Sequence, residues 1–95
     1  MELGIKGKKA LVTGGATGIG KAIVLDLAKE GVKVVFTSRY QEDLDKTLEE
    51  LGGKEKGHLA IKIDQLEEGA SEVLAKQIWE EFDQLDIVVN NIGSN

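Results

Sequence analysis

The stretch TGGATGIG, residues 13–20, lies between a segment rich in β-branched residues and an amphipathic segment. Residues 10–13 predict a strand, and residues 18–30 predict a helix because their apolar residues recur at three- and four-residue spacing. A chain that turns sharply from a strand into a helix presents the free N–H groups and the dipole of the helix to an anion. The stretch therefore predicts a turn that binds phosphate.

Three glycines of this turn meet three separate needs. Gly14 permits the sharp bend, Gly18 removes a Cβ from the path of the phosphate, and Gly20 lets the helix pack close to the sheet. Three glycines alone also occur in ordinary strand-to-helix turns. The predicted strand and helix on either side favour the phosphate-binding interpretation.

Strand and helix patterns alternate along the rest of the chain. We expect strands over residues 10–13, 32–38, 59–63 and 85–90, and helices over residues 18–30, 41–51 and 66–82. Each helix must return the chain to the same edge, so the strands are expected to run parallel in the order 3-2-1-4. The predicted fold class is α/β, a Rossmann-type doubly wound parallel sheet truncated to about four strands and three helices. Residues 1–95 are expected to form one domain.

Two of the predicted helices carry an apolar face that a sheet must cover. In the first helix this face is expected to consist of Ile19, Ala22, Ile23 and Leu27, and in the third helix of Val73, Leu74, Ile78 and Phe82. Trp79 and Phe82 fit either the core or a surface that faces a partner.

Composition argues against several classes of function. The net charge is −5 and the 12 Lys and Arg residues are scattered, so no nucleic acid is expected as partner, because a polyanion needs a basic face. The chain has no cysteine and one histidine, His58, which leaves no disulfide framework and no zinc site. No signal peptide is evident, and no segment approaches the ~20 apolar residues of a membrane span. We expect a soluble, cytoplasmic protein with His58 at its surface or at a sheet edge.

Two motifs together resemble a known family. Thr13-Gly14-x-x-x-Gly18-x-Gly20 is similar to the fingerprint of the classical short-chain dehydrogenase/reductase family, and the chain as a whole most resembles the 3-oxoacyl carrier-protein reductase branch of that family. Asn90-Asn91-Ile92-Gly93 resembles the Asn-Asn-Ala-Gly segment of that family, with an isoleucine in place of the alanine. The resemblance implies a nicotinamide dinucleotide as ligand. The residues that it places at the cofactor are Gly14, Ala16, Thr17, Gly18, Ile19, Gly20, Ser38, Arg39, Asp64, Gln65, Asn91 and Gly93.

Arg39 at the end of the second predicted strand bears on the choice of cofactor. An acidic residue there would bind the ribose 2′-hydroxyl of NAD, whereas a basic residue pairs with the 2′-phosphate of NADP. The sequence predicts NADP in preference to NAD. Two observations stand against this. Arg39 also fits a solvated charge paired with Glu42 or Asp43, and Thr17 occupies a position where NADP-preferring members often carry a basic residue.

The remaining polar residues at strand ends have two interpretations each. The resemblance implies that Asp64 binds the adenine amino group and that the backbone N–H of Gln65 meets a ring nitrogen; Asp64 equally fits the N-cap of the next helix. It also implies that Asn91 contacts the ribose while Asn90 braces neighbouring strands. Both asparagines also fit simple capping of strand ends.

The chemistry of hydride transfer is not visible in the sequence. The resemblance implies a tyrosine acid with a lysine four residues on, aided by a serine, but Tyr40 is the only tyrosine and Leu44 stands four residues on. We therefore expect no catalytic residue here and consider three hypotheses: the NADP(H)-binding half of a short-chain oxidoreductase, a non-enzymatic nucleotide-binding or interaction module, and one chain of a split enzyme. The open edge of the fourth strand predicts a homo-oligomer or a complementing chain.

Overall fold

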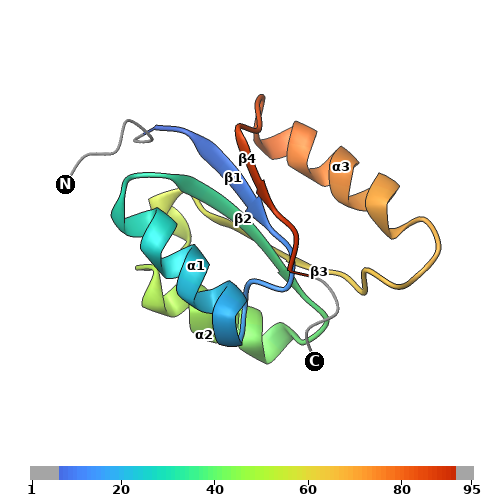
Figure 1. Ribbon diagram of the computed structural model, residues 1–95, viewed down its shortest axis with the longest axis horizontal. Coiled ribbons are helices and arrows are strands. Elements are labelled where there is room, and N and C mark those ends of the chain that lie inside the picture. Colours follow the sequence, from blue (N-terminus) through green and yellow to red (C-terminus); the bar gives the residue numbers. More distant parts are fainter. Residues whose placement is uncertain (1–6, 92–95) are drawn as a thin grey trace.

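Strands and helices alternate in the structure, a computed structural model that describes residues 7–91 (Figure 1). All four strands are parallel, and their order in the sheet is β3-β2-β1-β4. This confirms the predicted fold class and strand order. The elements are β1 (Lys9–Val12), α1 (Gly18–Lys29), β2 (Lys33–Ser38), α2 (Gln41–Glu50), a 3-10 turn η1 (Lys54–Lys56), β3 (Leu59–Lys62), α3 (Ala70–Glu81) and β4 (Ile87–Val89).

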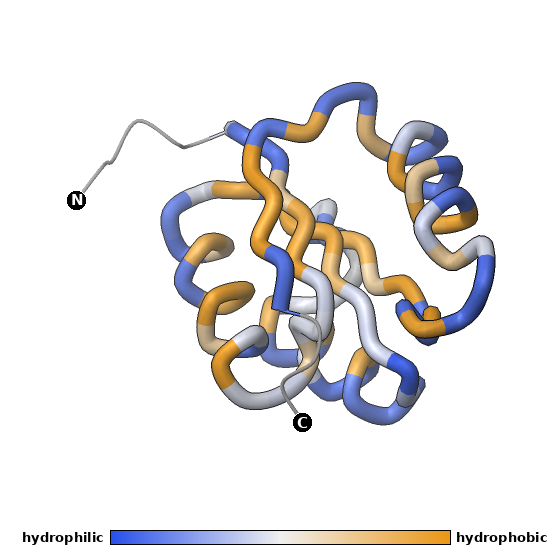
Figure 2. The backbone as a smooth tube through the Cα atoms, turned by 45° about the vertical axis from the view of Figure 1, so that its right-hand side comes forward, coloured by the Kyte–Doolittle hydropathy of each residue, from blue (hydrophilic) through white to orange (hydrophobic). Residues whose placement is uncertain are grey.

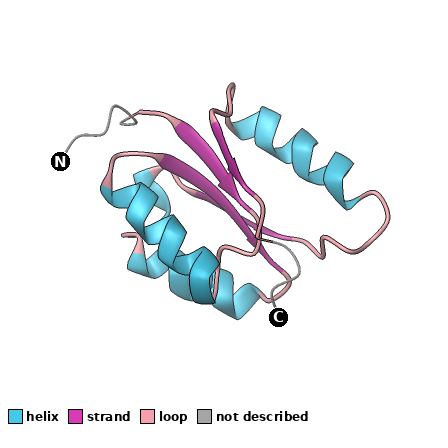
Figure 3. Ribbon diagram, in the orientation of Figure 1, coloured by secondary structure: helices cyan, strands magenta, loops and turns pink. Residues whose placement is uncertain are grey.

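The helices cover both faces of the sheet. Helices α1 and α2 lie on one face and α3 on the other (Figures 1 and 3), as right-handed crossovers demand when the chain reverses its direction of travel after β3. The apolar colouring concentrates on the strands between these layers (Figure 2). Within residues 7–91, no helix combines the length and the apolar character needed to cross a bilayer.

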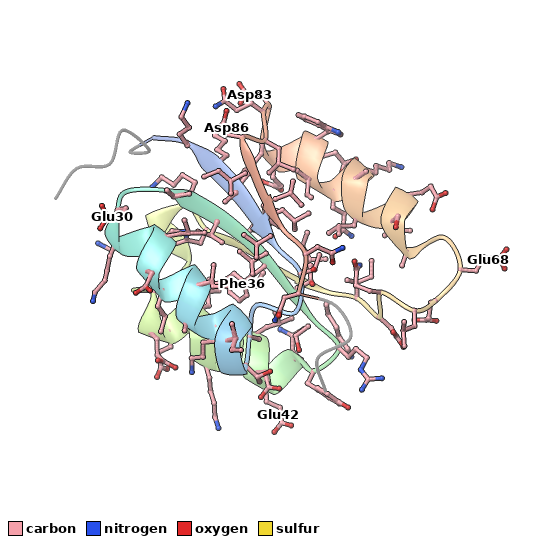
Figure 4. All side chains as sticks on the ribbon, viewed as in Figure 1. Glu30, Phe36, Glu42, Glu68, Asp83 and Asp86 are labelled. Atoms are coloured by element: carbon pink, nitrogen blue, oxygen red, sulfur yellow. The ribbon has the colours of Figure 1, made fainter. Side chains whose placement is uncertain are left out.

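Strand β2 contributes side chains to two hydrophobic clusters, one on each face of the sheet. Val34 and Phe36 belong to the cluster under α1 and α2, while Val35 between them belongs to the cluster under α3. All three are fully buried, because successive side chains of a strand point to opposite faces and both faces are covered. Figure 4 shows Phe36 between the sheet and α1.

The predicted buried face of α1 was partly wrong. Ile19 is 74% exposed and Ala22 is also exposed, whereas Val24 is fully buried. Ile23 and Leu27 pack against the same core, as expected. The first turn of α1 sits beside the glycine-rich turn rather than over the sheet, so the buried face runs through Gly20 and Val24, four residues apart.

The predicted start of the third helix was also wrong. Helix α3 begins at Ala70 rather than at residue 66, after Gly69 in a left-handed conformation with φ of 82°. Asp64 Oδ1 accepts the Leu66 N–H at 2.9 Å, which folds the chain into a turn before the helix. Asp64 is therefore not the N-cap of α3. Leu74, Ile78 and Phe82 are buried as expected, but Val73 and Trp79 are exposed.

At the edge of the sheet farthest from the glycine-rich turn, the start of β1 is bonded to the segment before β4. Asp86 Oδ2 accepts the Lys9 N–H at 2.9 Å, and Lys9 Nζ pairs with Asp83 Oδ1 at 2.8 Å. The two aspartates lie together beside the start of β1 in Figure 4. Hydrogen bonds from Lys9, through its ammonium to Asp83 and its backbone N–H to Asp86, lower the pKa of each carboxyl.

His58 has a structural role at the start of β3, which is an edge strand. Its Nδ1 accepts the Val34 N–H at 3.1 Å, so it extends the hydrogen-bonded ladder between β2 and β3 by one contact. The ring is half-buried, and desolvation together with the nearby Lys33 ammonium lowers its pKa from the ordinary value of 6.5. The neutral form with a free Nδ1 is the one that the fold stabilises.

We predict that stability falls as the pH drops below 6.5, the ordinary pKa of His58. The unfolded chain gains the proton first because the folded pKa is lowered, so the loss develops between 6.5 and that folded value. Replacing His58→Asn retains an acceptor in place of Nδ1 but does not titrate, and it should flatten this dependence. Replacing His58→Ala removes the acceptor and should cost about 1 kcal/mol at pH 7.5. Urea unfolding at pH 7.5 and 5.5 measures both effects; equal pH dependence in the wild type and His58→Asn would contradict the role of His58.

Candidate functional site

The carboxyl ends of the four parallel strands meet at one edge of the sheet. The glycine-rich turn follows β1, Arg39 follows β2, Asp64 comes two residues after β3, and Asn91 comes two residues after β4. The order β3-β2-β1-β4 places the turn near the middle of this edge, where the chain direction switches between β1 and β4. Ligands of open α/β sheets bind at such a switch point.

The beginning of the glycine-rich turn is held by Thr37 of β2. The Gly14 N–H donates to Thr37 Oγ1 at 3.1 Å, and the Gly15 N–H donates to the Thr37 carbonyl at 3.0 Å. Thr37 is 1% exposed, so the residue that accepts both bonds is buried. The turn is therefore anchored to the sheet on the side away from solvent.

The end of the turn is open. Among the hydrogen bonds of residues 7–91, none uses the backbone N–H groups of residues 16–20. Thr17 occupies the N-cap of α1 without a side-chain cap bond, and the first turn of α1 contains no acidic residue. The free N–H groups of Gly18, Ile19 and Gly20 thus point out of the N-terminal end of the 12-residue helix, where the helix dipole is positive. This arrangement fits an anion such as a phosphate.

The glycines differ in what surrounds them. Gly18 has φ of +57° and open space where a Cβ would point, which leaves room for a ligand. A Cβ on Gly20 would clash with the Gly14 carbonyl oxygen and lie 2.6 Å from Asn91 Nδ2. The close packing expected of Gly20 is thus against the turn and Asn91. Sequence reasoning missed Gly15, where a Cβ would lie 2.8 Å from Phe36 Cβ.

Thr13 and the two asparagines join the turn to the end of β4. Thr13 Oγ1 accepts the Asn91 N–H at 2.9 Å and donates to Asn90 Oδ1 at 3.1 Å. Asn91 Nδ2 donates to the Gly14 carbonyl at 3.3 Å. The bracing predicted for Asn90 is confirmed, while Asn91 holds the turn with its amide nitrogen. Gly93, which the sequence also places at the site, lies outside the described residues.

Arg39 is exposed at the end of β2 and lies next to an aromatic ring. Its Nη2 donates to the Tyr40 hydroxyl at 3.1 Å, and its guanidinium lies 5.3 Å from the ring centroid. The ion pairs within residues 7–91 join Lys9 to Asp83 and Lys21 to Glu50, so Arg39 is not paired with Glu42 or Asp43. Ser38 Oγ accepts the Tyr40 N–H at 3.1 Å, which orients this corner.

Asp64 and Gln65 lie half-buried where the chain leaves β3. The Asp64 carboxylate holds the turn through the Leu66 N–H described above. Gln65 Nε2 is a buried nitrogen without a hydrogen-bond partner among the described residues. It lines a mainly apolar groove of about 310 Å³ between α3, β1 and β4, which the sequence did not predict. The groove is lined by Leu11, Thr13, Gln65, Ser71, Leu74, Ala75, Ile78, Trp79, Leu85, Val88 and Asn90.

The residues predicted at the site therefore fall into two groups. Those of the turn and the asparagine segment are joined by hydrogen bonds, while Arg39 and Asp64 stand apart on neighbouring strand ends. Within residues 7–91, no three His, Asp or Glu side chains gather as a metal site would require.

Comparison with known proteins identifies the family. A family model described as short chain dehydrogenase matches residues 8–95. The chain belongs to the short-chain dehydrogenases. It is 40% identical over 91 residues to the 3-oxoacyl-[acyl-carrier-protein] reductase FabG of Vibrio cholerae. The aligned residues make up 96% of this chain and 36% of that enzyme. The resemblance inferred from the two motifs is thereby confirmed.

Solved structures with the same fold include two complexes with a nicotinamide dinucleotide. L-Sorbose reductase from Gluconobacter frateurii, complexed with NADPH and L-sorbose, superposes with a TM-score of 0.88 at 32% identity, covering 99% of this chain and 36% of that chain. The RhlG/NADP active-site complex of Pseudomonas aeruginosa superposes with a TM-score of 0.84 at 36% identity, and the match covers 98% of this chain and 35% of the RhlG chain. The chain spans about a third of the length of the curated relatives it matches.

We predict that Gly20→Ala is more damaging to the short-chain dehydrogenase fold than Gly18→Ala. The first change drives a methyl group into the Gly14 carbonyl and should lower the free energy of unfolding by about 2 to 3 kcal/mol. The second meets open space and costs only the strain of its positive φ, about 1 kcal/mol. Urea unfolding of the two variants measures the difference, and an equal or reversed order would contradict the packing described for Gly20.

Proposed function

We propose that this chain forms the NADP(H)-binding half of a short-chain oxidoreductase that interconverts a carbonyl and an alcohol by hydride transfer. The observation that carries the proposal is the open N-terminus of α1, where residues 16–20 offer free N–H groups, at the same edge of the sheet as the exposed Arg39 that follows β2. A dinucleotide carries a pyrophosphate and, in NADP, a further phosphate. Both are ligands that such donors prefer.

Each group at the strand ends has a part in this proposal. The pyrophosphate would lie on the N–H groups of Ala16, Thr17, Gly18, Ile19 and Gly20, with Gly14 shaping the turn. Asn91 would border the ribose next to the nicotinamide, and Gly93, outside the described residues, is proposed to let the backbone pass close to the cofactor. Asp64 and Gln65 would border the adenine, and Ser38 would border the ribose between the adenine and the pyrophosphate. The bound cofactor supplies or accepts the hydride.

Arg39 supports NADP in preference to NAD. Its planar fork is exposed and held by Tyr40 rather than by a carboxylate, so it is free to pair with a 2′-phosphate. Two similar structures carry NADP or NADPH in their complexes, which agrees with this choice. Thr17, at which many NADP-preferring members carry a basic residue, leaves Arg39 to make the main phosphate contact.

The 95-residue chain is proposed to be a single nucleotide-binding domain without its own proton donor for the carbonyl. Tyr40, its one tyrosine, accepts a hydrogen bond from Arg39 at the corner proposed for the adenine ribose. A further chain segment or a second protein would supply that acid. Val88 is 62% exposed on β4 and lines the apolar groove together with Trp79, which supports either a homo-oligomer or a complementing chain at this face.

We predict that Arg39→Asp weakens NADPH binding much more than NADH binding. The change replaces a cation by a carboxylate that repels the 2′-phosphate, and a loss of about a hundredfold for NADPH is expected. The matched control is Lys29→Gln, which removes a cation at the far end of α1 and should leave both affinities unchanged. Isothermal titration calorimetry measures the dissociation constants of NADPH and NADH for the wild type and for both variants. Equal losses for NADPH and NADH would contradict the assignment of Arg39 to the 2′-phosphate.

We predict that the chain alone does not oxidise NADPH with any of a panel of ketones and keto esters. Protonation of the carbonyl oxygen contributes about a hundredfold or more to such reactions, and no group is assigned to it here. Absorbance at the reduced-nicotinamide band measures turnover. Substrate-dependent oxidation that Tyr40→Phe abolishes would show that the chemistry lies within this chain and would overturn the half-enzyme proposal.

A further inference from the structure

Thr47 is a buried polar residue on α2. Only Leu44 and Thr47 are buried on this helix, and Thr47 is completely so. A threonine within a helix can point its hydroxyl to solvent or turn it back to the carbonyl four residues earlier. Here the hydroxyl instead donates to the Ala16 carbonyl at 3.3 Å, a partner 31 residues away in the glycine-rich turn.

The consequence follows from the geometry of the peptide unit. In a trans peptide the C=O and the N–H point in opposite directions within one rigid plane. The carbonyl of Ala16 and the N–H of Thr17 share such a plane. Drawing that carbonyl toward Thr47 therefore turns the Thr17 N–H away from Thr47, at a residue that is exposed and immediately precedes α1.

We propose that the Thr47 hydroxyl is a positioning residue for the pyrophosphate of the bound dinucleotide. The inference rests on the proposed function and extends it to a residue on a different helix from the one that binds the phosphate. Helix α2 begins at Gln41, two residues after Arg39. Helix α2 thus directly follows the residue proposed for the 2′-phosphate, and its Thr47 fixes the orientation of a peptide group in the turn proposed for the pyrophosphate.

The test compares Thr47→Val with Thr47→Ser in the purified protein. Valine matches the shape of threonine but leaves the Ala16 carbonyl without its partner, whereas serine keeps the hydroxyl. We expect Thr47→Val to weaken NADPH binding about tenfold and Thr47→Ser to restore it to within about twofold of the wild type. Thr47→Ala, which also removes the hydroxyl, replaces Thr47→Val if the latter does not fold.

A second ligand separates positioning from a general loss of structure. Adenosine 2′-monophosphate carries the phosphate proposed for Arg39 but no pyrophosphate, so Thr47→Val should bind it as the wild type does. The control Leu48→Ala removes a neighbouring side chain that packs on the core under α2. It should lower the midpoint of urea unfolding without changing the NADPH affinity.

The outcomes are distinguishable. Wild-type protein that does not bind NADPH overturns the proposed function and this inference with it. Wild-type protein that binds NADPH while Thr47→Val binds it equally well overturns the inference alone. Equal weakening of NADPH and adenosine 2′-monophosphate, or the same loss in Leu48→Ala, shows a structural role only and also overturns it.

Discussion

The structure of this site depends on the direction in which the peptide groups of the glycine-rich turn point. Carbonyl groups of the turn are bonded inward, that of Gly14 to the Asn91 amide and that of Ala16 to the Thr47 hydroxyl. The N–H groups of Gly14 and Gly15 are also bonded inward, both to Thr37. Only the N–H groups that follow are left for a ligand. Since buried polar groups must be paired, this inward pairing allows a turn with so many free donors to be stable.

The inward partners come from elements that are far apart in sequence. Thr37 lies on β2, Thr47 on α2 and Asn91 beyond β4, and the parallel sheet brings all three to the edge where β1 ends. The hydrophobic clusters on the two faces of the sheet hold the strands in place, and with them the residues that bond to the turn. At the opposite edge, Asp86 ties β4 to β1 through the Lys9 backbone, which keeps β4 and its asparagines in register with the turn.

Much of this arrangement could be predicted from the sequence because it depends on local pattern. Alternating strand and helix signals yielded the parallel order of the sheet, and the two motifs assigned the turn and Asn91 to the same cofactor. The start of α3 could not be predicted, because Asp64 uses its carboxylate in a turn and the left-handed Gly69 delays the helix. The spacing of the apolar residues is equally consistent with a helix that begins at residue 66 and with one that begins at Ala70.

Contacts set by register and packing were beyond the reach of the sequence. His58 reaches the backbone of β2 only because of the register between β2 and β3. The Thr47 hydroxyl reaches the Ala16 carbonyl only because of the position at which α2 packs. The buried face of α1 shifted from Ile19 to Val24 for a similar reason, since the first turn of that helix faces the site and not the core. Functional sites are places where such local rules are expected to fail.

The central claim is that the free N–H groups of residues 16–20 bind the pyrophosphate of a dinucleotide. Backbone amide chemical shifts of the ¹⁵N-labelled protein, followed by NMR during titration with NADPH, test it most directly. The account predicts saturable shifts that are largest at Thr17, Gly18, Ile19 and Gly20, with a second group at Arg39 and Gln65. Shifts confined to α3 and the groove beside it, or no saturable shift at residues 16–20, would contradict it.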